Sequence, residues 1–114
     1  YEGVNLEAII DLGKMTSFSE LSTGFLQDWN AWIFMPEWVD YYASNDGQNF
    51  YKLGRVLNDI DERNPDVLIK DFSLKTNSNT RYIKVIAKNR KLNPDWHRAP
   101  GGTCWIFADE ISIN

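Results

Sequence analysis

The sequence predicts an all-β protein, an antiparallel sandwich or barrel of roughly six to eight short strands. Apolar and polar residues alternate with a period of two along most of the chain, whereas stripes with the 3.6-residue period of a helix are missing. Gly, Pro, Asn and Asp gather between the alternating stretches, as is typical of turns. The length of 114 residues corresponds to one domain, residues 1–114.

The first half of the chain contains four expected strands. In the best defined one, the side chains of Val39, Tyr41 and Ala43 share one face. The stretch Asn45-Asp46-Gly47-Gln48 follows it as a hairpin turn, because Gly adopts a positive φ at little cost. The first strand is expected to stop at Gly13-Lys14. The four ranges are Leu6–Leu12, Phe18–Gln27, Trp38–Ser44 and Phe50–Leu53.

The second half contains three expected strands and two loops. The strands Leu68–Thr76 and Thr80–Lys88 are joined by the polar turn Asn77-Ser78-Asn79, and residues 58–66 and 89–103 are loops. The last strand, Cys104–Ile113, puts four apolar side chains on one face, which predicts that this face packs in the core: Trp105, Phe107, Ile111 and Ile113. On the opposite parity, Cys104 is expected to be a buried, inert thiol.

Charge and cysteine content exclude several classes of function. The chain has 12 basic and 16 acidic residues, a net charge of −4, which argues against electrostatic binding of nucleic acid or of an anionic bilayer. A single Cys excludes an internal disulfide framework and a Cys-based zinc site. We find no signal peptide, no apolar run long enough to span a membrane, and no initiator Met, so we expect a piece of a larger protein.

Aromatic residues are abundant, with 5 Trp, 5 Tyr and 6 Phe, and seven of them lie within residues 25–42. Sugar binding needs a flat aromatic face together with a few oriented polar groups. The stretch Asp28, Trp29, Asn30 and Trp32 offers both, so we take it as a candidate carbohydrate site. The alternative is that this aromatic cluster packs in the core.

A second candidate lies in the long loop, where Trp96, His97 and Arg98 follow one another. Arg presents a rigid fork of donors and His both donates and accepts, so the group could hold sugar hydroxyls. The alternative is that Trp96 only packs the loop onto the barrel. As the single His, His97 cannot form a two-His metal site.

Several short motifs resemble a known family. They occur in the order Asp11-Leu12-Gly13, Ser44-Asn45-Asp46-Gly47, Arg81-Tyr82-Ile83-Lys84-Val85 and Asp109-Glu110-Ile111. This order resembles the discoidin (coagulation factor 5/8 type C) domain, a jelly-roll family that includes the family 32 carbohydrate-binding modules. The stretches Gly24–Asp28, Trp32–Pro36, Pro94–His97 and Trp105–Glu110 narrow the resemblance. They resemble the C-terminal domain of bacterial family 20 β-N-acetylhexosaminidases (chitobiases), especially those of Bacteroidetes.

The resemblance implies a jelly-roll sandwich that starts after the family's first strand and after a loop that can hold structural calcium. Glu110 is then a weak calcium candidate without its partner loop, and no cofactor is expected. The pair Asp109-Glu110 is not expected to be catalytic, because adjacent strand residues point to opposite faces and glycosidases need two carboxyl groups facing one bond. The resemblance also implies an extracytoplasmic location.

Together these observations predict a non-catalytic accessory domain that binds N-acetylhexosamine-containing glycans next to a catalytic domain in the same chain. The alternative is a structural domain that packs on the parent's catalytic barrel and has no ligand of its own. Membrane binding is not expected, because Asp28, Glu37 and Asp40 make the neighbourhood of the candidate tryptophans acidic.

Overall fold

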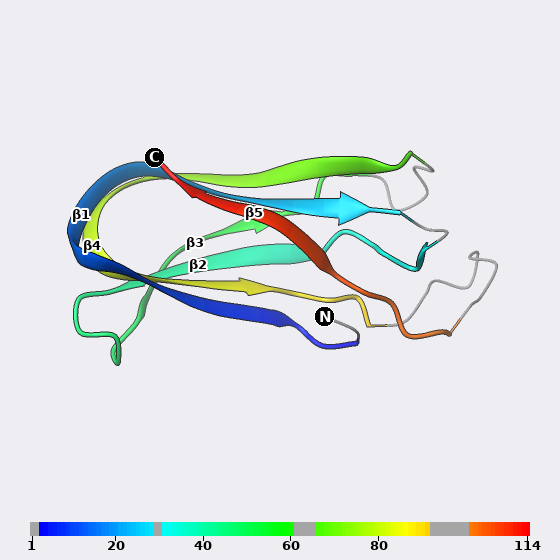
Figure 1. Ribbon diagram of the computed structural model, residues 1–114, viewed down its shortest axis with the longest axis horizontal. Helices are drawn as coiled ribbons and strands as arrows, with labels where there is room; N and C mark the ends of the chain where they lie inside the picture. Colours follow the sequence, from blue (N-terminus) through cyan, green and yellow to red (C-terminus); the bar gives the residue numbers. More distant parts are fainter. Residues whose placement is uncertain (1–2, 29–30, 61–65, 92–100) are drawn as a thin grey trace.

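The computed structural model describes residues 3–28, 31–60, 66–91 and 101–114. Within these ranges, five strands form one sheet in the order β3-β2-β4-β1-β5, and every strand pair is antiparallel (Figure 1). Their bounds are β1 Leu6–Gln27, β2 Trp38–Ser44, β3 Tyr51–Leu57, β4 Leu68–Ala87 and β5 Phe107–Ile113. None of the described residues forms a helix long and apolar enough to cross a membrane.

The two long strands, β1 and β4, fold the sheet back on itself. They pair from Leu6–Ala87 at one end to Gln27–Leu68 at the other, and both turn sharply at the left of Figure 1. At this bend the register shifts between Asp11 and Thr16, where β1 carries extra residues that include Gly13 with a φ of 83°. The result is the antiparallel β-sandwich that the sequence predicts.

Each half of the folded ribbon belongs to a different layer. The four-stranded layer contains β3, β2, the second half of β4 and the first half of β1. The three-stranded layer contains the first half of β4, the second half of β1, and β5. We call the end of the sandwich opposite the bend the loop end, because β1 ends there in one layer and β2 begins there in the other (Figure 1).

Two predicted strand ends are wrong. The sequence predicts a stop at Gly13-Lys14 and a turn at Asn77-Ser78-Asn79, but β1 and β4 continue through both sites as bent strands. The residues that normally end strands here accommodate a bulged bend, in which Ser78 still pairs with Phe18. Consequently β1 and β4 each span two of the predicted strands, and the described residues form five strands where the sequence predicts more.

The first hairpin is confirmed. Strand β2 has the predicted bounds, and Gly47 in the following turn has a φ of 77°. The Asp46 carboxylate accepts hydrogen bonds from the backbone N–H groups of Gln48 and Asn49, at 2.9 and 2.8 Å. These bonds hold the pKa of Asp46 well below its usual range. The returning strand β3 starts at Tyr51 and is longer than predicted.

The core lies between the layers and contains the predicted face of β2, since Val39, Tyr41 and Ala43 are fully buried. The Tyr41 hydroxyl crosses to the three-stranded layer, where it donates to the Phe72 carbonyl oxygen (2.6 Å) and lies 2.9 Å from the Thr23 hydroxyl. The other buried core residues are Leu6, Phe18, Leu21, Phe25, Met35, Phe72, Ile83, Val85, Ala87 and Ile106.

The predicted inward face of the last strand is wrong in its first half. Phe25 pairs with Ala108 and Gly24 with Glu110, so Asp109 is an extra residue that forms a β-bulge. A one-residue shift exchanges the two faces of a strand. Ile106 is therefore buried, whereas Trp105 is 42% and Phe107 is 53% exposed.

Candidate functional site

The structure describes two of the residues that the sequence selects for sugar binding, Asp28 and Trp32. Both lie at the loop end, in the turn that follows β1. The predicted site residues Trp29, Asn30, Trp96, His97 and Arg98 lie outside the described residues, so their predicted roles stay predictions.

Backbone hydrogen bonds close the turn that carries Trp32. The Asp28 N–H donates to the Ile33 carbonyl oxygen and the Ile33 N–H to the Asp28 carbonyl oxygen, both at 2.9 Å. Ala31 adds a third bond to the Asp28 carbonyl oxygen at 3.1 Å. Trp32 consequently has a φ of 62°, in the left-handed region that a bulky side chain rarely adopts. The surrounding hydrogen bonds thus hold Trp32 in a strained conformation.

The same bonds bring a second tryptophan next to the turn. The Trp105 N–H donates to the Trp32 carbonyl oxygen at 2.8 Å, and the Phe34 N–H donates to the Trp105 carbonyl oxygen at 3.1 Å. Ile33 and Trp105 form a parallel bridge. Trp105 is exposed and Trp32 half-buried, so the loop end presents two tryptophans on adjoining segments.

Sequence reasoning missed Trp105, because strict alternation assigned it to the core. The signal that could have identified it is the break in alternation after Ala108, where polar Asp109 and Glu110 stand side by side before Ile111. Two adjacent polar residues inside a strand indicate a bulge.

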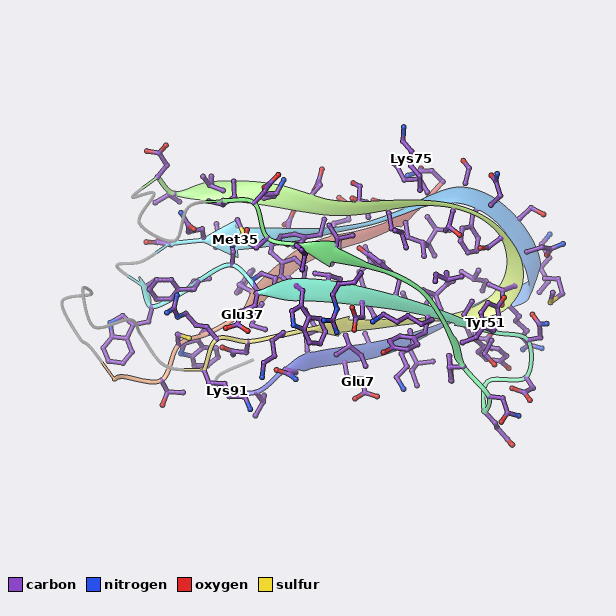
Figure 2. The ribbon with its side chains drawn as sticks, turned by 180° about the vertical axis from the view of Figure 1, so that it is seen from behind. Glu7, Met35, Glu37, Tyr51, Lys75 and Lys91 are labelled. Carbon is purple, nitrogen blue, oxygen red and sulfur yellow. The ribbon has the colours of Figure 1, made fainter. Side chains whose placement is uncertain are left out.

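A small recess with a volume of about 120 Å³ lies at the same end of the sandwich. Its buried apolar part is formed by Phe34 and Met35, and Figure 2 places Met35 and Glu37 at the end away from the bend. The Gln27 side-chain amide donates to the Asp66 carbonyl oxygen at 3.1 Å, and the Arg90 guanidinium lies 5.5 Å from the centre of the Phe34 ring. The lining residues are Gln27, Phe34, Met35, Glu37, Asn58 and Arg90.

The buried Asn89 side chain supports the backbone behind these residues. Its amide nitrogen donates to the Val4 carbonyl oxygen (3.1 Å), and its oxygen accepts from the Lys91 N–H (2.7 Å). The Cys104 thiol also donates to this oxygen, at 3.3 Å. Cys104 is buried as predicted, and burial raises the pKa of its thiol. The buried thiol therefore helps to hold the Asn89 side chain in place and does not act as a nucleophile.

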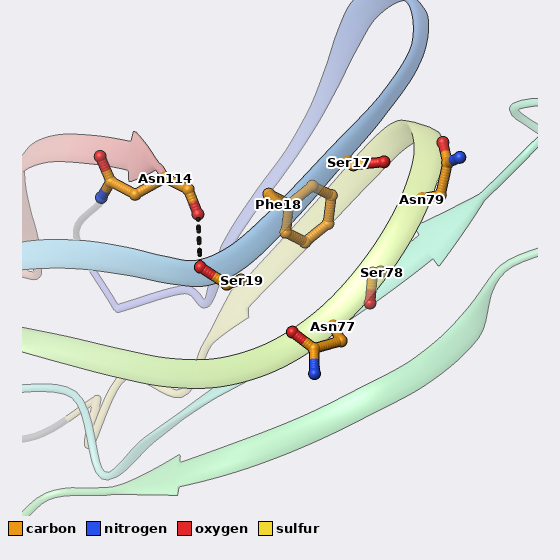
Figure 3. A pocket seen from close by; sticks show the side chains of 7 residues that line it. All are labelled: Ser17, Phe18, Ser19, Asn77, Ser78, Asn79 and Asn114. Carbon is orange, nitrogen blue, oxygen red and sulfur yellow. Dashed lines mark hydrogen bonds between the residues drawn. The ribbon is translucent and has the colours of Figure 1, made fainter.

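A larger hollow lies instead at the bend, with a volume of about 570 Å³ (Figure 3). Its lining is uncharged, with hydroxyl and amide side chains around the buried ring of Phe18. The Ser19 hydroxyl donates to the Asn114 carbonyl oxygen at 3.3 Å. Because Phe18 is only 6% exposed, this hollow offers no aromatic face to a sugar. The lining residues are Ser17, Phe18, Ser19, Asn77, Ser78, Asn79 and Asn114.

Trp38 is not a free stacking surface either. The Arg55 guanidinium lies 3.9 Å from the centre of its ring and donates two hydrogen bonds to the buried Asp40 carboxylate, at 2.7 and 3.0 Å. Burial alone would raise the pKa of Asp40, but hydrogen bonds from Arg55 and Lys52 outweigh it and lower that pKa. Asp40 thus fixes Arg55 over Trp38.

The calcium candidate Glu110 is exposed on β5, opposite Gly24. Among the described residues, no group of three or more His, Cys, Asp or Glu side chains lies close enough together to hold a metal ion. The residues around Glu110 in the described part of the chain therefore do not fit a calcium site.

Comparison with known proteins identifies the fold. No family model and no curated protein matches the chain. Among solved structures, a family 32 carbohydrate-binding module of a family 31 glycoside hydrolase from Clostridium perfringens has a TM-score of 0.55 and 20% identity over 94% of this chain and 67% of that one. The C-terminal domain of a chitobiase from Bacteroides fragilis has a TM-score of 0.48 and 14% identity, and the match covers 97% of this chain and 66% of that one. The chain has the discoidin-like sandwich fold of the family 32 module.

Proposed function

We propose that the chain is a non-catalytic carbohydrate-binding domain whose site lies at the loop end. The observation that carries this proposal is the strained Trp32, hydrogen-bonded through its backbone to the exposed Trp105. A non-glycine residue in the left-handed region costs on the order of 1–3 kcal/mol and tends to mark functional sites. Two tryptophans on adjoining segments provide the large, rigid apolar area on which sugar rings stack.

The ligand class that fits best is a glycan containing N-acetylhexosamine. The recess at the loop end, with a volume of about 120 Å³, is too small for a whole sugar but suits one substituent of its ring, such as an acetamido group. Its methyl group would contact Phe34 and Met35, and its polar atoms would lie among Gln27, Asn58 and Arg90. The predicted partners Asp28, Trp29, Asn30, Trp96, His97 and Arg98 would complete the site.

In this proposal the domain accompanies the catalytic domain of a bacterial family 20 β-N-acetylhexosaminidase outside the cytoplasm. Its role is to keep the enzyme close to its polymeric substrate, which raises the local substrate concentration without changing the chemistry. The solved structure with a similar fold is a carbohydrate-binding module of a glycoside hydrolase, which supports this role.

Titration of the isotopically labelled chain by NMR tests the proposal. With N-acetylglucosamine, chitobiose, N-acetylgalactosamine and galactose in separate titrations, we expect the indole signals of Trp32 and Trp105 to shift with a Kd on the order of 0.1–1 mM for the N-acetylated sugars. Weaker shifts with galactose would identify the acetamido group as the selected feature. The absence of indole shifts at tens of millimolar sugar would disprove carbohydrate binding at this site.

Variants of Trp32 separate its role in binding from its role in folding. Both Trp32→Asn and Trp32→Ala should abolish sugar binding, because each removes the ring. Asn adopts the left-handed region more readily than Ala, so the Asn variant should be more stable by about 1 kcal/mol. Urea unfolding measures this difference, and equal stabilities would show that the positive φ is not retained.

A further inference from the structure

The outer face of the three-stranded layer carries a pattern that sugar binding does not explain. Strand register arranges its outward side chains in three rows (upper layer in Figure 1). The first row contains Ile69, Leu26 and Phe107, and the second contains Asp71 and Glu110 on either side of Gly24. The third row is Ser73, Ser22 and Ser112.

The first row is apolar and open to solvent. Ile69 is 57% and Phe107 is 53% exposed, and Leu26 lies between them on β1. Directly opposed residues on neighbouring strands are about 5 Å apart, so the three side chains form a continuous apolar strip. Contiguous apolar surface on a folded protein typically marks an interaction site.

The carboxylates of the second row lie next to this strip, and none of them forms an ion pair with a described residue. None of the ion pairs in the described ranges involves Asp71, Asp109 or Glu110. On the outer face of the four-stranded layer, by contrast, carboxylates are neutralised: Glu7 pairs with Lys84, Asp11 with Arg81, and Asp40 with Lys52 and Arg55.

Gly24 makes the acidic row accessible. A Cβ atom at this position would lie 3.1 Å from the Asp71 carboxylate oxygen, and 3.6 Å from both the Asp109 Cβ and the Ile69 Cγ2 atoms. Because Gly24 has no side chain, a cationic group of a partner can approach Asp71 and Asp109 between the strands. Such a contact would replace water around charges that have no counter-ion among the residues that the structure describes.

From the apolar strip and the unpaired carboxylates beside it, we propose that this face docks a folded protein domain whose surface combines apolar side chains with Lys or Arg. This partner is the catalytic domain of the same polypeptide, an identity that rests on the proposed accessory role. A second copy of the chain is the poorer occupant, because it presents the same carboxylates and carries a net charge of −4. The sugar-binding tryptophans lie at the loop end and stay available.

Hydroxyl-radical footprinting of the natural full-length polypeptide and of the 114-residue chain tests the docking. In the full-length polypeptide, modification of Phe107 and Ile69 should fall at least about fivefold, since the centre of a docked interface is dry. Tyr51, which is 49% exposed on β3 of the other layer, should react equally in both samples and is the internal control. Raising the salt to about 1 M, where the Debye length is about 3 Å, should restore part of the reactivity.

Matched variants connect the protection to this face. Small-angle X-ray scattering of the full-length polypeptide should show a larger radius of gyration for Ile69→Ser/Phe107→Ser and for Asp71→Asn/Asp109→Asn. The control Ile9→Ser, at a 55% exposed position on the outer face of the other layer, should leave the radius unchanged. Equal footprints in the two samples, or a natural polypeptide without a second domain, would overturn the proposal.

Three further outcomes also decide the proposal. Protection of Phe107 that grows with concentration in the 114-residue chain alone would identify a second copy as the occupant and overturn it. Protection in the full-length polypeptide together with no sugar-induced shift at Trp32 would support docking while disproving the proposed sugar binding. Sugar binding without protection would disprove docking alone.

Discussion

The Tyr41 side chain joins the two layers through a polar contact inside an otherwise apolar core. Its hydroxyl donates to the Phe72 carbonyl oxygen and lies within hydrogen-bond distance of Thr23, and all three residues are fully buried. An unmade hydrogen bond in such a place costs the desolvation of the abandoned group. Burial, with a smaller effect of the Asp71 charge, raises the pKa of Tyr41 to about 12.

We expect Tyr41→Phe to lower the free energy of unfolding by about 1–3 kcal/mol at neutral pH, because it leaves the Phe72 carbonyl and the Thr23 hydroxyl without this partner. The difference should depend on pH. Tyr41 ionises near pH 10.0 when unfolded but near pH 12 when folded, so its contribution is complete below pH 10 and is lost as the pH rises toward 12. Urea unfolding at pH 8, 10 and 11 should therefore show the gap between the two proteins narrowing, and a constant gap would contradict this account.

At the same scale, local sequence patterns predicted the buried Tyr41 and Cys104 and selected Asp28 and Trp32. Strict alternation placed Trp105 in the core, because its exposure depends on one extra residue at Asp109, four positions away, whose bulge only the pair Asp109-Glu110 hints at. Local patterns could not predict the positive φ of Trp32, which is set by backbone bonds between Asp28, Ile33 and Trp105. Both features arise from pairing between distant segments.

At the scale of elements, the bent ribbon of β1 and β4 explains where strand prediction failed. Gly13 and the run Asn77-Ser78-Asn79 are poor strand formers and read as ends. In the fold they occupy the bend, where bulges and weak strand formers allow sharp curvature. Strand β2 was predicted correctly because its alternation and its hairpin turn are both local signals.

The layers also contact one another at a glycine. A Cβ atom at Gly54 on β3 would lie 3.0 and 3.1 Å from the two methyl carbons of Leu74 on β4, so we expect Gly54→Val to destabilise the protein by about 1–3 kcal/mol through overpacking. Combining it with Leu74→Ala should recover part of that loss, with a coupling energy of about 0.5–3 kcal/mol in a double-mutant cycle. Leu68→Ala is the control partner, because it lies about 20 Å along β4 from Leu74. Equal coupling with both partners would show that the contact is not the cause.

At the scale of the whole molecule, the folded sheet has three distinct regions of surface, which lie on different sides of the sandwich. The loop end carries Trp32 and Trp105, the outer face of the three-stranded layer carries the apolar strip, and the bend lies at the opposite end of the sandwich from Trp32 and Trp105 (Figure 1). A module with this arrangement could bind a glycan at one end while its flank is held by a neighbouring domain. The prediction of an antiparallel sandwich or barrel followed from alternation and turn residues, and the resemblance added the jelly roll, whereas the division into surfaces required the register of β1 with β4 and β5.

Because β1 and β4 run through both layers, neither layer can lose its strands without disrupting the other, and we expect a single cooperative unfolding transition. Fluorine NMR of the chain labelled with fluorotryptophan reports on the layers separately: Trp38 lies in the four-stranded layer, and Trp105 lies next to β5 of the three-stranded layer. Both signals should change at the same urea concentration as the far-ultraviolet circular dichroism. Refolding should take milliseconds to seconds, since nearly all pairing joins segments distant in sequence. Separate midpoints for Trp38 and Trp105 would mean that the bend acts as a hinge between two independently stable layers.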